Sequence, residues 1–307
     1  MKKKILITGA SGFIGSWVTR KLVAYDVVAV VSPFSEPWRL RGIEKKVKVV
    51  KADLSQISQA QKIFNGFKPD YVIHLATHGV YQYQQGDDKR IVEDNYMMTF
   101  NLLKESVRTG VKRFINTGSV FEYGSRPGKV KERDVDITDI LNEYSAVKMA
   151  TTALASSFAD KINVITLRPF TAYGPAEDPA RFIPLTIKRA KLEEPIHIVK
   201  GVVRDFVYVE DIAAAYLEAI KKDFVSGSVL NVGSGRRATL EEAALLIKTI
   251  TNSKSPIVND KKYVRKKESR CWADISKTKK VLGWTPKYSL KDGIGKTINY
   301  GILTQLK

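Results

Sequence analysis

Cysteine and histidine are scarce in this chain. Its 307 residues include one cysteine, Cys271, and three histidines. A single cysteine excludes a disulfide within the chain, and so few thiol and imidazole ligands are too few for a zinc site. We therefore expect no metal site, and we expect Cys271 to be a small side chain within a strand.

Long apolar runs are also missing. No stretch approaches the roughly 20 apolar residues that a membrane-spanning helix needs. The first ten residues, MKKKILITGA, have the charge of a signal peptide, but their apolar part ends before Ser11. A buried first strand explains that segment better, so the expected location of the protein is the cytoplasm.

Acidic residues are few relative to basic ones. The chain has 32 Asp and Glu against 51 Lys and Arg, a formal net charge of +19 at pH 7. Such a charge suits nucleic acid, an anionic membrane surface or an anionic small substrate. The basic residues are spread along the chain, however, and no basic block is interleaved with aromatic residues. We therefore predict a solvated basic surface, with no nucleic-acid partner and no membrane partner.

The rest of the composition is that of a globular protein. Hydrophobic residues make up 44% and charged residues 27%, a balance that excludes a disordered chain. Short β-branched runs alternate with longer helical patterns, which is typical of a parallel sheet buried on both faces. The expected strands are 4–8, 26–31, 47–50, 71–76, 112–118, 163–169 and 229–233. We predict an α/β protein with a Rossmann doubly wound parallel sheet.

A glycine-rich turn follows the first expected strand. Gly9, Gly12 and Gly15 lie between that strand and an amphipathic segment at 12–25. Gly9 would permit a tight turn, Gly12 would let the backbone approach a pyrophosphate, and Gly15 would let helix and sheet pack closely. The start of the helix then faces the anion. The motif predicts dinucleotide binding, and the turn also contains Ser11, Phe13 and Ile14.

The regular alternation ends at Pro169. Proline and glycine punctuate 173–184, and two short helices are expected within 235–300, at 240–250 and 275–282. We predict that residues 1–169 form an NAD(P)-binding Rossmann domain to which strand 229–233 returns. Residues 170–307 are predicted to form mainly a smaller, mixed α/β substrate-binding domain.

The end of the second expected strand bears on the choice of coenzyme. Dinucleotide folds often place an acidic residue there for the ribose hydroxyls, but this chain has Ser32. Serine leaves room for a 2′-phosphate, which Arg39 or Arg41 in the next loop would neutralise. This favours NADP(H), with NAD(H) as the alternative. Asp53 and Leu54, after the third expected strand, fit a contact to the adenine amino group.

Tyr144 and Lys148 are four residues apart in a predicted helix. That spacing puts both side chains on one helix face. A lysine ammonium near a phenol stabilises the phenolate, so we expect Lys148 to lower the pKa of Tyr144 and let it exchange protons near neutral pH. Ser119, at the end of the fifth expected strand, adds a hydroxyl. Together with the glycine turn, the three residues predict a catalytic group.

At this point the chain resembles the extended short-chain dehydrogenase/reductases that act on nucleotide sugars, in the epimerase/dehydratase family. The resemblance runs over nearly the full length. It rests on ITGASGFIG at 7–15, ADL at 52–54, HLAT at 74–77, NTGSVFEYG at 116–124, YSAVK at 144–148, LRPFTAYGP at 167–175, RDFVYVEDIA at 204–213, LNVGSG at 230–235 and WADISKTKKVLGW at 272–284.

The resemblance implies roles for individual residues. Tyr144 would be the catalytic acid/base, Lys148 would bind the nicotinamide ribose, and Ser119 would hydrogen-bond the reacting sugar oxygen. Arg204 and Arg265 would clamp the substrate diphosphate, a role that Arg270 could share. Three further cofactor contacts follow the fourth expected strand, at Leu75, Ala76 and Thr77, and the substrate contacts include His78 and Thr171. His74 is expected to be a core residue.

Departures from the family pattern narrow the function. Dehydratases carry an Asp-Glu pair directly after the serine or threonine, whereas here Glu122 comes three positions after Ser119 and strand alternation points it away. Epimerases usually have the acidic ribose clamp that is missing here, and asparagine where Thr171 stands. The sequence looks closest to 4-ketoreductases of the CDP-abequose and CDP-paratose synthase type, which reduce an NDP-4-keto-6-deoxyhexose in deoxysugar biosynthesis. The alternative is an NDP-sugar 4-epimerase of the UDP-glucose/galactose type with tightly bound NAD.

Family members commonly dimerise through the two helices that flank the active site. In this chain those helices would be about 89–109 and the helix that carries Tyr144. We therefore expect a homodimer that binds a nucleotide-diphosphate sugar.

Overall fold

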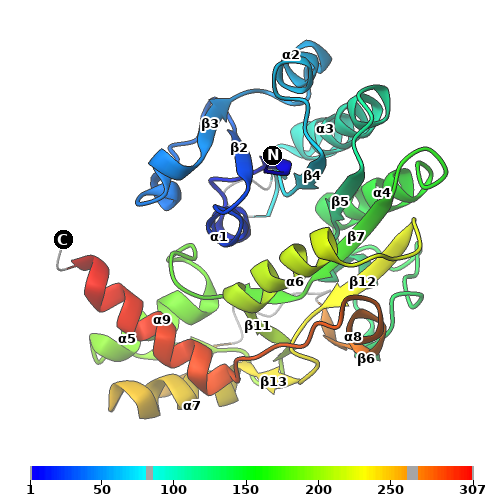
Figure 1. Cartoon of the computed structure of the whole chain (residues 1–307). Helices are drawn as coiled ribbons and strands as arrows, with labels where there is room; N and C mark the ends of the chain where they lie inside the picture. The colour runs from blue at the N-terminus through cyan, green and yellow to red at the C-terminus, as the bar shows by residue number, and fades with distance from the viewer. Residues whose placement is uncertain (1, 81–85, 261–268, 306–307) are drawn as a thin grey trace.

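The computed structural model describes residues 2–80, 86–260 and 269–305. A parallel sheet of seven strands lies at its centre (Figure 1). These strands are β1 (Lys4–Thr8), β2 (Asp26–Val31), β3 (Lys48–Lys51), β4 (Tyr71–His74), β5 (Arg113–Thr117), β7 (Val164–Pro169) and β12 (Ser228–Val232). Their order is β12-β7-β5-β4-β1-β2-β3. The predicted Rossmann fold class is confirmed.

The strands are apolar on both faces because both faces are covered. Ile5 and Ile7 belong to the core on one side of the sheet, and Leu6 between them belongs to the core on the other side. Figure 1 shows the two helical layers. One layer holds α1 (Phe13–Lys21) and α6 (Val209–Lys221), and the other holds α2 (Ile57–Phe67), α3 (Asp88–Arg108) and α4 (Glu143–Ser156).

The strand order changes direction at β1. From β1 the chain moves outward through β2 to β3, and then returns to place β4 on the other side of β1. In open parallel sheets a ligand crevice forms at such a switch point, outside the carboxyl ends of the strands. The glycine turn follows β1 and the segment 75–77 follows β4, so both line this crevice.

The smaller C-terminal part has its own core. Tyr173, Ile183, Phe206, Ile247 and Ile294 are among its buried members. Its elements are β8 (Thr171–Tyr173), α5 (Phe182–Lys191), β9 (Ile196–Ile198), β10 (Val203–Arg204), β11 (Phe206–Tyr208), β13 (Ala238–Thr239), α7 (Leu240–Thr251), β14 (Ile257–Asn259) and α9 (Leu290–Gln305). Strand β12 leaves this part and pairs with β7 in the central sheet. The division into 1–169 and 170–307 stays a prediction.

After residue 235 the structure has one helix more than the two that were expected. Helices α7 and α8 (Ser276–Leu282) match the expectation, but α9 follows them. Three glycines make α9 hard to predict from the sequence, because glycine disfavours a helix interior. Gly293 has a packing reason to be there, since a Cβ at that position would collide with the Tyr173 hydroxyl.

The remaining short elements lie around the crevice and beside the central sheet. They are the 3-10 helices η1 (Trp38–Leu40), η2 (Glu44–Lys46) and η4 (Val120–Tyr123), and the paired strands β6 (Pro127–Val130) and β15 (Arg270–Ala273). Cys271 is buried in β15, as expected. Within the described ranges, no helix has both the length and the apolarity to cross a bilayer. The same residues contain no cluster of three or more potential metal ligands.

Candidate active site

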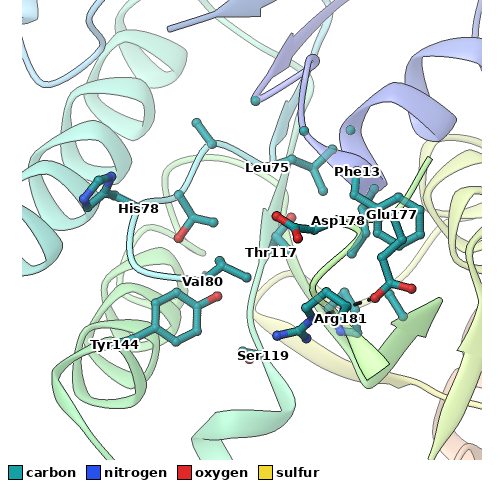
Figure 2. Close-up of a pocket in the computed structure, with 18 of the residues that line it drawn as sticks. Phe13, Leu75, His78, Val80, Thr117, Ser119, Tyr144, Glu177, Asp178 and Arg181 are labelled. Atoms are coloured by element: carbon teal, nitrogen blue, oxygen red, sulfur yellow. Dashed lines mark ion pairs between the residues drawn. The ribbon is translucent and has the colours of Figure 1, made fainter. Parts of the chain in front are cut away.

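A cavity of about 1360 Å³ lies between the carboxyl ends of the central strands and the C-terminal part. It brings together the residues predicted from sequence, which come from segments far apart in the chain. They are Gly9, Ser11, Gly12, Phe13, Ile14, Gly15, Ser32, Arg39, Asp53, Leu54, Leu75, Ala76, Thr77, His78, Ser119, Tyr144, Lys148, Thr171 and Arg204. Arg265 lies outside the described residues. Figure 2 shows part of the wall.

The glycine turn is shaped by close backbone contacts. Gly9 has a φ of +65°, and a Cβ there would lie 2.5 Å from the Ala76 nitrogen. A Cβ on Gly15 would collide with the Gly9 carbonyl. Gly12 precedes α1 and has no side chain to cap it, so the first amides of the helix face the cavity. This cradle fits a dinucleotide diphosphate.

The part of the cavity beyond β2 is lined by Ser32, Arg39 and a carboxylate that was not expected there. The Ser32 hydroxyl accepts the Phe34 amide at 3.3 Å, and Arg39 donates to two backbone carbonyls, that of Ala176 at 2.8 Å and that of Ser11 at 3.3 Å. Arg41 does not line the cavity, but Glu36 does. Glu36 was not identified from the sequence, because it follows the end of β2 by five residues and so lies outside the usual position of the ribose clamp.

Ser119 occupies a turn rather than the end of a strand. It caps η4, where its hydroxyl accepts the Phe121 amide at 3.2 Å. Glu122 accepts the Ser119 backbone amide at 2.7 Å. Strand alternation therefore does not set the direction of Glu122, because Ser119 and Glu122 belong to a 3-10 turn. Glu122 nevertheless does not line the cavity, because its carboxylate is fully buried and paired with Arg168 at 2.8 Å.

Tyr144 and Lys148 share one face of α4. Asn142 caps this helix by accepting the Ser145 amide, which fixes its first turn. The Tyr144 ring packs edge-on against Phe121, with ring centroids 5.9 Å apart. The Lys148 ammonium lies 5.8 Å from the centre of the Tyr144 ring and donates to the Thr117 carbonyl at 3.0 Å.

Burial dominates the protonation of both groups. It raises the pKa of Tyr144 to about 12, against the smaller lowering effects of the Thr77 and Ser119 hydroxyls and the Arg181 charge. Burial lowers the pKa of Lys148 to about 8, which Glu122 partly opposes. The expected lowering of the Tyr144 pKa by Lys148 is not found: the Thr77 and Ser119 hydroxyls and the Arg181 charge are the groups that lower it.

The two histidines near the site differ in environment. His74 is buried between Thr8 and Thr99, whose hydroxyls lie 2.8 and 3.0 Å from its ring nitrogens. Burial lowers the pKa of His74 to about 3, so it is a neutral core residue, as expected. His78 lines the cavity, and Asn95 holds its backbone. The His78 ring lies on the α3 side of its loop, away from Ser119 (Figure 2).

The C-terminal part supplies the opposite wall of the cavity. Thr171 lies on β8, and the Arg204 guanidinium donates to the carbonyls of Val203 and Ser269 at 2.8 and 2.7 Å. Glu177 and Arg181 face the Tyr144 side across the cavity (Figure 2), with Oε1 of Glu177 3.7 Å from Nε of Arg181. The Glu177 side chain is 6% exposed, its Oε2 has no partner, and burial raises its pKa to about 8.

Glu177 and Arg181 were not identified from the sequence. Their spacing of four is the signal that was available, but it is informative mainly on a helix. Here both residues lie in the loop between β8 and α5. Only the fold brings this loop to the cavity.

The parallel sheet, glycine cradle and Ser119-Tyr144-Lys148 group define an extended short-chain dehydrogenase/reductase. The chain belongs to the NAD dependent epimerase/dehydratase family, which it matches over residues 5–233. It is therefore an enzyme of this class, and the predicted family is confirmed.

Three known proteins are similar to the chain over nearly their whole length. CDP-abequose synthase of Salmonella muenchen is 26% identical, with 97% of this chain and 98% of that protein covered. The structure of UDP-glucose 4-epimerase from Thermotoga maritima with UDP-glucose is 30% identical, with a TM-score of 0.86 and coverage of 98% and 99%. The structure of UDP-glucuronic acid 4-epimerase from Bacillus cereus with UDP-glucuronic acid and NAD is 27% identical, with a TM-score of 0.85 and coverage of 99% and 100%.

Proposed function

We propose that this enzyme is an NADPH-dependent 4-ketoreductase of an NDP-4-keto-6-deoxyhexose. The observation that carries the proposal is the phenol of Tyr144 beside the Ser119 hydroxyl in a cavity that begins at a dinucleotide cradle. The full-length similarity to CDP-abequose synthase supports it. When bound, the nicotinamide coenzyme supplies a hydride to the C4 carbonyl of the sugar.

The coenzyme would be held by residues along one side of the cavity. The glycine turn from Gly9 to Gly15 would bind its diphosphate, and Lys148 its nicotinamide ribose. Asp53 and Leu54 would meet the adenine, while Ser32 and Arg39 would meet a 2′-phosphate. Leu75, Ala76 and Thr77 would line the space between these ends.

Tyr144 would donate the proton that reduction requires. Because burial raises the pKa of Tyr144 to about 12, the phenol carries its proton at neutral pH. It would give this proton to the C4 oxygen as negative charge develops there. The Ser119 hydroxyl would donate a hydrogen bond to the same oxygen. The raised pKa of Tyr144 thus suits a proton donor, which is the role that reduction needs.

The substrate would lie against the C-terminal wall. Thr171 and Arg204 would contact the diphosphate side of a nucleotide sugar, and His78 is proposed to contact the substrate from the other wall. The Arg204 guanidinium, held by its bonds to two backbone carbonyls, lines this side of the cavity. Arg265 stays a predicted second arginine for this diphosphate.

A 4-epimerase with bound NAD is the second candidate. The loop that carries Glu177 is fastened to the glycine turn through Arg39, which favours retention of a coenzyme. The similarity to two 4-epimerases points the same way. An epimerase would oxidise and then reduce C4 on the same coenzyme, with Tyr144 as base and then as acid.

Nicotinamide absorbance separates the two candidates. The protein is mixed with NADPH, or separately with NADH, and a panel of NDP-4-keto-6-deoxyhexoses. A reductase should oxidise the coenzyme stoichiometrically with the sugar, and Tyr144→Phe should lower the rate about a thousandfold. The opposite result is no net oxidation of the coenzyme, while chromatography shows that the protein converts unmodified UDP- or GDP-hexoses to their C4 epimers. That outcome overturns the reductase in favour of the epimerase.

We also propose a homodimer through α3 and α4. These helices pack against each other, and α3 exposes Val92, Tyr96 and Met97 by 39% to 46%. Exposed apolar side chains grouped on one helix are typical of an interface. Sedimentation of the wild type should give a dimer, and the double variant Tyr96→Lys with Met97→Glu should give a monomer. A wild-type monomer at micromolar concentration would contradict the proposal.

A further inference from the structure

The loop between β8 and α5, residues 174–181, forms a strap along the cavity. It belongs to the C-terminal part in sequence, yet Glu177, Asp178, Ala180 and Arg181 all line the cavity. In Figure 2 its labelled side chains lie across from Tyr144 and Ser119. The strap therefore forms the wall that faces the catalytic group.

Two side chains of the Rossmann part hold this strap. The Trp17 indole N–H on α1 donates to the Pro175 carbonyl at 3.1 Å. The Arg39 Nε donates to the Ala176 carbonyl at 2.8 Å. Ala176 has a φ of +66°, a conformation that alanine rarely adopts without support from its surroundings. The donated hydrogen bonds provide such support.

Arg39 connects the strap to the dinucleotide cradle. Besides Ala176, its guanidinium reaches the Ser11 carbonyl in the glycine turn at 3.3 Å, and it stacks 4.4 Å from the Trp38 ring centre. The side chain also lines the cavity near Ser32, where an adenosine 2′-phosphate is expected. One guanidinium thus touches the strap, the cradle and the coenzyme end of the cavity.

A 2′-phosphate would compete with the strap for Arg39. A phosphate accepts two parallel guanidinium hydrogen bonds, which are stronger than a bond to a neutral carbonyl. The Nε–Nη2 edge of Arg39 is one of the two edges that can make such a pair, and Ala176 occupies its Nε. A coenzyme without the 2′-phosphate leaves this bond in place.

We propose that Arg39 is a positioning residue that fastens the strap and releases it when the coenzyme carries a 2′-phosphate. The proposal rests on the proposed function only in requiring that the cavity binds a nicotinamide dinucleotide. A fastened strap retains NAD(H), and a released strap lets NADP(H) exchange. Arg39 therefore sets whether the coenzyme is a retained group or an exchanging substrate.

Hydrogen–deuterium exchange of the strap tests the fastening directly. Peptides covering 174–181 are followed in the unliganded protein, with NADH and with NADPH. We expect Arg39→Met to speed exchange about tenfold in the unliganded protein and with NADH, the size of one lost hydrogen bond to a charged donor. In the wild type, NADPH should give faster strap exchange than NADH.

Matched variants separate fastening from charge. Arg39→Lys keeps the charge, but a lysine cannot reach both carbonyls. Strap exchange should therefore be as fast as in Arg39→Met. Arg41→Met removes a nearby arginine that does not line the cavity, and it should behave as wild type. Trp17→Phe removes the other donor without touching the phosphate site, and it should speed exchange equally with both coenzymes. A thermal melt verifies that each variant is folded.

Coenzyme release is the second readout. Stopped-flow displacement, read by nicotinamide fluorescence, should show NADH leaving the wild type about tenfold more slowly than NADPH, and Arg39→Met should speed the release of NADH about tenfold. Strap exchange unchanged by Arg39→Met, or identical with NADH and NADPH in the wild type, overturns the proposal. Failure of both coenzymes to bind overturns the proposed function instead, and the unliganded arm still decides whether Arg39 fastens the strap.

Discussion

The Arg168 guanidinium and the Glu122 carboxylate meet 2.8 Å apart behind Ser119, with both side chains at most 5% exposed. The other oxygen of Glu122 holds the Ser119 backbone amide. This pair fixes the turn that presents the serine hydroxyl to the cavity. It also removes Glu122 from proton transfer, because an acid that takes part in elimination must reach the substrate.

Glu122→Gln should therefore affect stability more than chemistry. Leaving Arg168 buried without its counter-charge should cost about 3–5 kcal/mol of unfolding free energy by denaturant titration. The folded fraction should keep its turnover number within about threefold, well short of the loss of a general acid. Glu105→Gln is the matched control, since Glu105 is buried but its partner Arg108 is 45% exposed, and it should cost less. A large loss of turnover with unchanged stability would instead make Glu122 a catalytic acid.

Lys148→Met should make the folded protein more stable at neutral pH while lowering its activity. Burial lowers the pKa of Lys148 from 10.5 to about 8. Below pH 8 Lys148 is protonated in both the folded and the unfolded chain. Burying the ammonium then costs the folded chain about 3 kcal/mol. Between pH 8 and 10.5 the folded chain loses the proton first, so the stability of the wild type rises relative to the variant.

Unfolding titrations of both proteins from pH 7 to 10.5 measure this difference. The variant should be more stable at pH 7 by about 2 kcal/mol, after allowance for the lost hydrogen bond to the Thr117 carbonyl. The advantage should shrink towards pH 10.5. A constant difference across this range would contradict the assigned pKa.

Gly9→Ala should disrupt the dinucleotide cradle. The new Cβ would have both an unfavourable φ of +65° and a contact of 2.5 Å to the Ala76 nitrogen. We expect NADPH affinity, measured by fluorescence titration, to fall by at least about tenfold, with a lower melting temperature. Gly66→Ala is the control, since that glycine is inside α2 with open space around it and the change should stabilise by about 0.5–1 kcal/mol. Unchanged NADPH binding in Gly9→Ala would place the coenzyme elsewhere.

Arg181→Met should make Tyr144 a weaker acid. The Arg181 charge lowers the pKa of Tyr144, so its removal raises that pKa further. The turnover number for ketone reduction should fall about three- to tenfold, while the dissociation constant of the coenzyme stays unchanged. Arg181→Lys should restore most of the turnover because it returns the charge. A loss confined to KM would show instead that Arg181 only binds substrate.

The sequence by itself determined the central sheet, the glycine turn and the shared helix face of Tyr144 and Lys148. These features depend on local sequence: short β-branched apolar runs in buried strands, a spacing of four residues on a helix, and glycine where the backbone must turn tightly. Neighbours in sequence impose such spacing before any tertiary contact forms. Helix α9 was missed because its glycines disrupt the same local pattern.

Only the tertiary structure decided which partners the charged side chains take. Arg39 meets Ala176 across 137 residues, and Arg168 meets Glu122 across 46. Burial then reversed the expected shift in the pKa of Tyr144, because removing a phenolate from water costs more than the Thr77 and Ser119 hydroxyls and the Arg181 charge return. Long-range packing and desolvation set these outcomes, and neither leaves a periodic signal along the chain.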